Sequence, residues 1–400
     1  MENLDHLREK GITYLDTACM GLVAPAATSE IRAMLTKMEY FSYDNPLIRF
    51  EELHSYFPRA REKAACLIGA AVEEIALVES TTHGLGLIAA SLPLQRGNNI
   101  LACDLEFFPT TLCWKTGQEK VGVEVRPVST TNGEVKISDF EAQLDRNTRA
   151  IMVSAVQEAN GFRVDLQELA TLARNHNCYL IVDGIQEAGA LQVDLSSVDV
   201  DVYCAGGAKW LCNPFGMGFL YVNRRIMEDL EPGFYGYFNT GEPKGGWNQY
   251  LASPQRTPFD PLELNRGAQK FETGGTGNCL GALGLYMALE VLLQEGPAEV
   301  EKKVFELNDI LCSGLASLNL NTTSCIRPRN RSGITTFTLP GGPLAEMQLV
   351  NELSNKRIYT THRYTSGSGG IRVSPHYYNN SEDINNLLDA VELFTKRGVL

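Results

Sequence analysis

Between residues 73 and 222, short apolar runs alternate with helical patterns, and this alternation constrains the fold more than any other feature. The runs "EEIALVES", "NNILACD", "RAIMVSAVQ" and "CYLIVDG" each predict a strand. The amphipathic stretch "DLQELATLARNHN" separates the last two, so the chain must cross over the sheet as a helix between them. Continuous apolar strands joined by helices are typical of a mostly parallel sheet covered on both faces.

The rest of the chain indicates a second, smaller unit. A Pro- and Gly-rich tract at 231–266 carries several aromatic residues and is expected to form a long structured loop. After it come a long helix at 281–293, a further helix from residue 298, the strand-like run "GITTFTLP" and a last helix in "NSEDINNLLDAVELF". We therefore expect a large domain up to residue 265 and a smaller α+β domain in residues 266–400.

Composition narrows the possible functions. The 400 residues carry a formal net charge of −13, which argues against nucleic acid or an anionic membrane as the main partner. No apolar run approaches the ~18 residues of a membrane span, and the N-terminus is unlike a signal peptide. The ten cysteines are scattered without a C-x-x-C pair, which favours reduced thiols in a cytoplasmic protein over disulfides or a metal site.

Three polar stretches follow predicted strands: "STTHG", "DGIQEAG" and "GGAKW". Ligands of open parallel sheets bind at the carboxyl ends of strands, so we expect these stretches to converge. Thr81 and Thr82 would open a helix, whose N-terminus suits an anion such as phosphate. Asp183 ends an apolar strand, where an unpaired carboxylate is costly. Lys209 is the one charged residue from 203 to 222.

Each feature has an ordinary explanation when taken alone. Lys209 could lie on a surface turn, the threonine pair could only cap a helix, and Asp183 could cap the segment that begins at Ile185. The ordered combination matches pyridoxal 5′-phosphate (PLP). This cofactor needs a lysine for its imine, an acid to keep its ring nitrogen protonated, and an anion site for its phosphate.

The stretches "VDGIQEAG" and "GGAKWLCNPFGMGFLYV" resemble the fold-type-I PLP enzymes of the class V aminotransferase family. This family includes cysteine desulfurases, selenocysteine lyases, C–S lyases and isopenicillin N epimerase-like proteins. The resemblance extends to "YLDTACMGLVAP", "FETGGTGN" and "GIRVSPHYYNNSEDI". It implies an α/β fold: a large PLP-binding domain (16–265) with a mostly parallel seven-stranded sheet, and a small α+β domain formed by residues 1–15 with 266–400.

The resemblance also implies a role for each matching residue. Lys209 should carry the cofactor as an imine and later move the substrate Cα proton, while Asp183 should pair with the ring nitrogen. Arg372 should bind the substrate α-carboxylate, for which a guanidinium is well shaped. The other expected cofactor contacts are Gln186 to the ring oxygen, Phe107 (with Phe108 as its rival) stacked on the ring, and Thr81, Thr82 and the second subunit's Thr276 on the phosphate.

Two departures from the family pattern concern the phosphate and the sulfur chemistry. Many relatives have Ser-Gly-His before the lysine, whereas this chain has Gly-Gly-Ala at 206–208. His83 and the glycine N–H groups are our candidates to replace the lost phosphate donors. Family desulfurases also carry a persulfide-forming cysteine in the loop before the arginine. The matching segment 361–372 contains none, and Cys325, the nearest upstream, is expected to be structural.

A third departure is Glu158 in "VQEANGF", where relatives have a neutral polar residue. A carboxylate there could repel a substrate carboxylate, recognise an amine, or simply face solvent.

We therefore predict a homodimeric PLP enzyme with shared active sites that acts on a small amino acid, whose amine displaces Lys209 from the imine. A C–S lyase or an aminotransferase is favoured. The alternatives are a cysteine desulfurase or selenocysteine lyase, an epimerase, and a catalytically inactive binding protein. A nicotinamide-dependent oxidoreductase is disfavoured because "GGAKWLCNPFG" lacks the G-x-G-x-x-G spacing.

Overall fold

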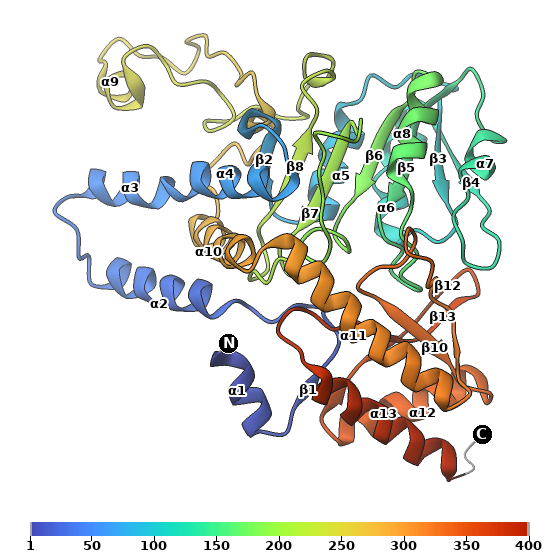
Figure 1. The fold of residues 1–400 in the computed structure, drawn as a ribbon. Coiled ribbons are helices and arrows are strands. Elements are labelled where there is room, and N and C mark those ends of the chain that lie inside the picture. Colours follow the sequence, from blue (N-terminus) through green and yellow to red (C-terminus); the bar gives the residue numbers. More distant parts are fainter. Residues whose placement is uncertain (1, 398–400) are drawn as a thin grey trace.

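The computed structural model of the chain describes residues 2–397. Its largest sheet has seven strands in the order β2-β8-β7-β6-β5-β3-β4 (Figure 1). The strands are β2 (Ile75–Val78), β3 (Asn99–Cys103), β4 (Glu124–Val128), β5 (Thr148–Ser154), β6 (Tyr179–Asp183), β7 (Val202–Gly206) and β8 (Gly218–Val222). The predicted seven-stranded, mostly parallel sheet is confirmed.

Strand direction decides where the functional residues meet. β8 runs antiparallel to both of its neighbours, β2 and β7, while the pairings among β7, β6, β5, β3 and β4 are all parallel. β2 and β7 therefore point the same way, and Val78 and Gly206 lie on either side of Gly218 in register. The carboxyl ends of every strand but β8 thus share one edge of the sheet.

Helices cover both faces of this sheet. On one face, alternate strand residues such as Leu180, Val182 and Tyr203 pack with α4 (Tyr56–Ile68), α8 (Leu166–Asn175) and α10 (Cys279–Glu295). On the other face, Ile181 and Cys204 pack with α5 (Thr81–Ser91). Because side chains alternate across a strand, apolar residues at every position require this covering of both faces.

The smaller unit is built on an antiparallel sheet in the order β12-β13-β10-β9. Its core also takes in helices α11, α12 and α13. The bounds are β9 (Asn321–Thr322), β10 (Thr335–Thr338), β12 (Thr361–Thr365), β13 (Ser368–Val373), α11 (Pro297–Ser317), α12 (Gly342–Asn355) and α13 (Ser381–Lys396).

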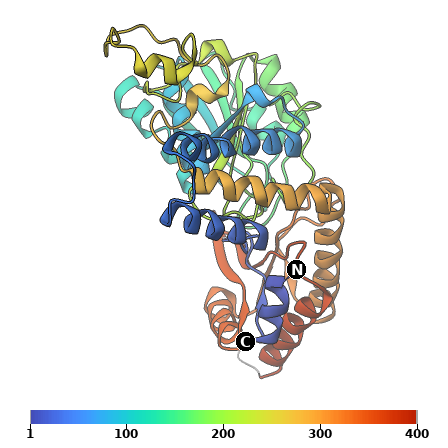
Figure 2. The same ribbon diagram turned by 90° about the vertical axis from the view of Figure 1, so that its left-hand side faces the viewer.

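The N-terminal segment lies with this smaller unit. β1 (Thr13–Tyr14), which follows α1 (Glu2–Glu9), pairs in parallel with β11 (Ile358–Tyr359). Figure 2 shows both chain ends at the same end of the molecule. The pairing supports the proposal that the first residues belong with the C-terminal part.

The boundary between the two units is less simple than a cut at residue 265. α10 packs against both α4 and α2 (Pro25–Glu39), and its Ala282, Leu285 and Leu289 belong to the core of the large sheet. We propose that the large unit extends through α10. The remaining helices are α3 (Pro46–His54), α6 (Phe108–Leu112), α7 (Ile137–Glu141) and α9 (Gly246–Ala252), the last of which lies within the Pro- and Gly-rich tract.

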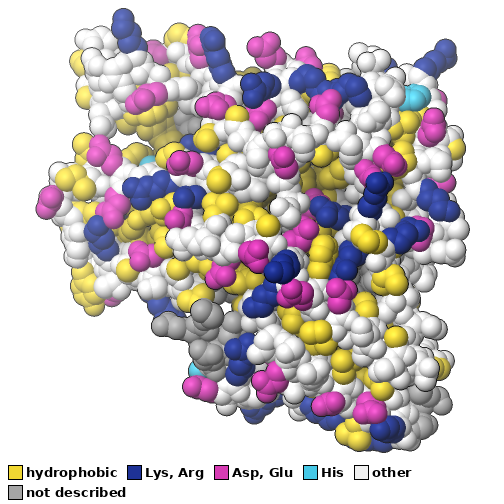
Figure 3. Space-filling model, viewed as in Figure 1, with side chains coloured by type: hydrophobic (Ala, Val, Ile, Leu, Met, Phe, Trp, Pro, Cys, Tyr) yellow, Lys and Arg dark blue, Asp and Glu magenta, His cyan; other side chains and the backbone are white. Residues whose placement is uncertain are grey.

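The surface carries charges of both signs. Figure 3 shows basic and acidic side chains interspersed over the face it presents. Within residues 2–397, no single helix is long and apolar enough to cross a bilayer. α10 and α11 meet those criteria of length and composition only as a pair, and they bend by 76° where they join.

Candidate active site

Four segments meet at the shared carboxyl edge of the large sheet. Asp183 is the last residue of β6, and Gly206 is the last residue of β7, three positions before Lys209. Thr81 is the first residue of α5, which follows β2, and Phe107 follows β3. The strand order therefore places together residues that are far apart in the sequence.

The loop that carries Lys209 is held by close backbone contacts. Gly21 donates its N–H to the carbonyl of Ala208 at 2.9 Å, and a Cβ on Gly21 would collide with the carbonyl oxygen of Lys209. Only glycine allows this approach. The N-terminal stretch "YLDTACMG" thus packs directly on the lysine loop.

The environment of Lys209 favours its neutral amine. Burial lowers the pKa of this amine, and the positive charge of Arg372 lowers it further, while Asp183 and Glu158 oppose the shift. Within the described part of the chain, Lys209 forms no ion pair with N···O within 4.0 Å. A neutral amine is the nucleophilic form of lysine, as imine formation requires.

Asp183 is a buried carboxylate without a cationic partner in contact. Burial raises the pKa of Asp183 to about 7, against the opposing effects of the Ile185 N–H and the charge of Lys209. Its Oδ1 accepts the Ile185 N–H at 2.9 Å, and no ion pair within 4.0 Å joins it to a described residue. A protonated ring nitrogen would supply the positive charge that such a carboxylate needs.

The two candidate stacking residues occupy different positions. The ring centroid of Phe107 lies 5.9 Å from Nζ of Lys209, whereas Phe108 is 64% exposed. Glu106 helps to fix this loop, because its buried carboxylate accepts hydrogen bonds from Ser154 and Gln157 near the end of β5. The geometry favours Phe107 over Phe108 as the residue beside the lysine.

The phosphate end of the site is formed by α5 and β7. Thr81 Oγ1 accepts the Gly206 N–H at 2.8 Å, and a Cβ on Gly206 would lie 3.2 Å from that oxygen. A side chain at 206 would therefore crowd Thr81. Thr82 is exposed next to it. The helix N-terminus and these hydroxyls provide donors suited to phosphate.

His83 is engaged elsewhere in the same turn. Its backbone N–H is bound by the capping Ser80 at 3.1 Å, and its ring Nδ1 lies 3.4 Å from the backbone nitrogen of Glu79. The ring therefore faces the N-cap of its own helix, and its role as a phosphate donor remains a prediction.

Gln186 is tied to the loops on either side. Its Oε1 accepts from Trp210 Nε1 at 2.8 Å, and its Nε2 donates to the carbonyl of Ala18 at 3.0 Å. One N–H of the amide is left to donate to a ring oxygen.

Arg372 reaches the site from β13 of the smaller unit. Its Nη1 lies 3.1 Å from both the carboxylate and the backbone carbonyl of Glu158, and its Nη2 lies 3.5 Å from Asp16. The guanidinium is thus brought to the end of β5, as the proposed carboxylate-binding role requires. Its two acidic partners were not foreseen, although Asp16 stands in the quoted stretch "YLDTAC".

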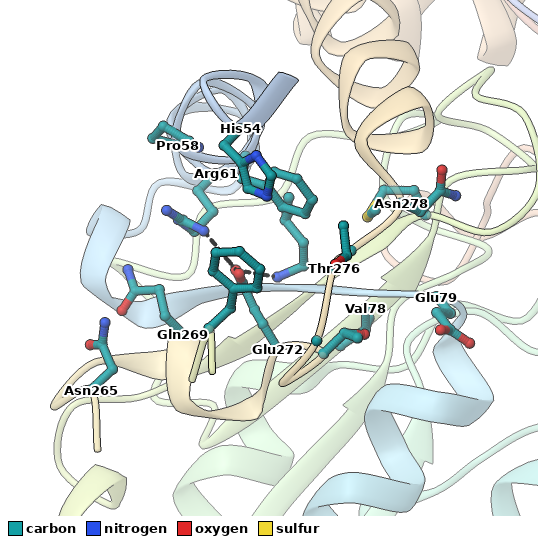
Figure 4. A pocket seen from close by; sticks show the side chains of 17 residues that line it. His54, Pro58, Arg61, Val78, Glu79, Asn265, Gln269, Glu272, Thr276 and Asn278 are labelled. Carbon is teal, nitrogen blue, oxygen red and sulfur yellow. Dashed lines mark hydrogen bonds and ion pairs between the residues drawn. The ribbon is translucent and has the colours of Figure 1, made fainter. Parts of the chain in front are cut away.

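Thr276 is the candidate that the resemblance assigns to the phosphate site of a second subunit. It lines a pocket of about 470 Å³ beside α3 and α4, and Lys209 is not among the lining residues (Figure 4). Glu272 in this pocket pairs with Arg61 at 2.8 Å and accepts the Leu77 N–H at 2.9 Å. A contribution of Thr276 to a second subunit's phosphate site therefore stays a proposal.

These residues fit PLP. A lysine with a lowered pKa, a buried carboxylate that lacks a cation, a helix N-terminus with hydroxyls and a nearby aromatic ring would hold the amine-reactive, ring and phosphate parts of the cofactor. The bound group would act as an electron sink for the substrate's Cα. Fold and site together define a PLP-dependent enzyme of fold type I.

Comparison with known proteins identifies the family. Residues 13–387 match the family described as Aminotransferase class-V, and the chain belongs to this family. It is 26% identical over 346 residues to a probable cysteine desulfurase of Methanothermobacter thermautotrophicus, covering 83% of this chain and 82% of the relative. It is 28% identical over 342 residues to isopenicillin N epimerase of Streptomyces clavuligerus, covering 84% of each.

Solved structures support the same fold. Two structures of the protein C-DES superpose with a TM-score of 0.86 at 22% identity, and each covers 97% of this chain. The alignments cover 98% and 99% of those chains. One is a mutant with glycine covalently linked to the PLP cofactor, and the other is the cystine C–S lyase in complex with cysteine persulfide. The predictions of family, fold type and PLP dependence are confirmed.

Proposed function

We propose that the enzyme is a C–S lyase that cleaves the Cβ–S bond of a small sulfur-containing amino acid. Support comes from the relatives, which include probable cysteine desulfurases and a cystine C–S lyase. The observation that carries the choice of lyase over desulfurase is the segment 361–372, which leads into Arg372 and contains no cysteine. Without a thiol there to accept the sulfur, the sulfur would be released as sulfide or persulfide.

Different residues of this chain bind the substrate, move its proton and maintain the charge of the cofactor. Arg372 and the loop around Gly21 and Lys209 orient the amino acid, and the Lys209 amine takes the Cα proton. The electron pair of the broken Cβ–S bond leaves on sulfur, and one water is consumed as the remaining three carbons are released as pyruvate and ammonia. Asp183 maintains the positive charge of the ring that makes the Cα proton acidic.

A panel of amino acids tests the proposal. L-Cystine, L-cysteine and a control without sulfur, L-alanine, would be incubated with the purified enzyme, and pyruvate, ammonia and sulfide or persulfide measured. The expected result is equal release of pyruvate and ammonia from a sulfur substrate and none from L-alanine. Lys209→Ala should abolish both the release and the borohydride-trapped covalent adduct of lysine with PLP. Amine transfer to a keto acid without pyruvate release would instead establish an aminotransferase.

We further propose that the enzyme is a homodimer in the cytoplasm. The resemblance of "FETGGTGN", which contains Thr276, to the family's inter-subunit phosphate loop supports an active site completed by a second copy. The ten free cysteines are compatible with a reducing compartment.

A further inference from the structure

The carboxylate of Glu158 holds the guanidinium to which a substrate carboxylate would bind. The Arg372 side chain is 1% exposed and lies 3.1 Å from Oε2 of Glu158, whose own side chain is 14% exposed. On the other side of the guanidinium, Asp16 lies at 3.5 Å. Arg372 therefore already faces two carboxylates before any substrate arrives.

We propose that Glu158 occupies Arg372 in place of the substrate's α-carboxylate, and that the substrate must displace the Glu158 side chain to bind. The inference rests on the proposed function, because it concerns how an amino acid enters that site. Glu158 would thus compete with the substrate's α-carboxylate for Arg372.

Charge repulsion explains why Arg372 cannot bind the Glu158 carboxylate and the substrate's α-carboxylate at the same time. Two negative side chains already face one positive one in a largely buried position. A third carboxylate would add a net repulsion that is costly away from water. An incoming carboxylate therefore binds well only when Glu158 moves away.

The contacts of Arg372 allow this exchange. The backbone carbonyl of Glu158 accepts from Nη1 at 3.1 Å, so this contact and Asp16 continue to hold the guanidinium when the Glu158 side chain leaves. The Nε–H of Arg372 is buried and has no hydrogen-bond partner. A buried donor without a partner is unusual in a purely structural ion pair, and a carboxylate could satisfy it.

The exchange of one carboxylate for another also keeps the negative charge near Lys209 nearly the same. The charge of Glu158 raises the pKa of both Lys209 and Asp183, so Glu158 acts on the same cavity. Replacing one carboxylate by another at Arg372 keeps the local negative charge nearly constant. Substrate entry by exchange would therefore leave the Lys209 amine close to its resting state.

The test measures binding of propionate and of the neutral propionamide to the purified enzyme by calorimetry. Glu158→Gln keeps the shape but removes the charge, and Glu158→Ala removes the side chain. Both should bind propionate about ten-fold more tightly than the wild type, which corresponds to about 1.4 kcal/mol, with propionamide unchanged. For an amino-acid substrate, KM should fall by a similar factor with a smaller change in kcat.

A matched control removes a carboxylate paired with arginine outside the site. Glu74 is buried and lies 3.5 Å from Nε of Arg224, so Glu74→Gln should leave propionate binding at the wild-type value. Equal or weaker propionate binding in both Glu158 variants, or no detectable binding in any variant, would overturn the inference. Because propionate is not a substrate, this result is independent of the pyruvate assay that tests the lyase proposal.

Discussion

Nε2 of His376 lies 2.8 Å from the carbonyl oxygen of Trp210. A carbonyl can only accept, so the proton is on Nε2, and Nδ1 is buried without a partner. His376 follows β13, which carries Arg372, and Trp210 follows Lys209. A single hydrogen bond thus links the segment of the carboxylate-binding arginine to the loop of the reactive lysine.

His376 should make the fold sensitive to acid. Burial lowers the pKa of His376 from 6.5 to about 4, so the folded protein resists protonation that the unfolded chain accepts. Its contribution to stability is complete above pH 6.5 and is lost as the pH falls toward 4, up to about 3 kcal/mol. Between pH 7 and pH 4, the melting temperature should fall less in His376→Gln than in the wild type. His176→Gln is the control, because this histidine is exposed just after α8. Equal slopes in all three proteins would contradict this account.

Asp183 should destabilise the cofactor-free protein as the pH rises. Its pKa is raised from 3.8 to about 7, so the folded state holds a proton that the unfolded chain has released. Stability should therefore fall between pH 4 and 7, by up to about 4 kcal/mol. Cofactor-free Asp183→Asn should melt higher than wild type at pH 8. With PLP added, the order should reverse, because only the carboxylate pairs with the protonated ring; an unchanged order would count against the assigned role.

Phe107 and Phe108 form a natural matched pair. Phe107→Ala should weaken PLP binding about ten-fold, since ring stacking contributes about 0.5–1.5 kcal/mol beyond burial and its ring is the one near Lys209. Phe108→Ala should leave the affinity near the wild-type value, because that side chain is 64% exposed. Titration of the cofactor-free proteins followed by visible absorbance measures both. The opposite ranking would move the stacking role to Phe108.

Mixing inactive variants tests whether Thr276 serves a second subunit. Lys209→Ala and a sufficiently damaging Thr276 variant, such as Thr276→Asp, would each be inactive alone. In a dimer of the two, one site has an intact Lys209 and an intact Thr276 from its partner. Statistical mixing should then restore about a quarter of the wild-type activity. No recovery after verified subunit exchange would place Thr276 outside the partner's site.

The sheet could be predicted from sequence because its signal is local. Runs such as "CYLIVDG" are apolar at every position, which only a strand buried on both faces tolerates. Asp183 and Lys209 also stand out in the sequence as candidates, since charged residues at the ends of such strands are rare. The antiparallel direction of β8 and the packing of α10 on the large core depend on long-range contacts that no local pattern encodes.

The ion pairs of the site could not be predicted from the sequence, because they too join residues that are far apart in the chain. Glu158 stands out in the sequence, but its contact with Arg372 joins residues more than two hundred positions apart. The hydrogen bond from His376 to Trp210 could not be predicted either, because a histidine next to tyrosines in the sequence does not indicate its partner. Family likeness could indicate roles for Arg372 and Lys209, but it could not indicate what each one touches.

The pairing of β1 with β11 has a consequence for biosynthesis. All seven strands of the large sheet lie within residues 75–222 and can assemble while the ribosome is still translating. Thr13 and Tyr14 are made before these strands, yet their partners Ile358 and Tyr359 are made after them. The pairing of β1 with β11 therefore forms only after every strand of the large sheet has been synthesised.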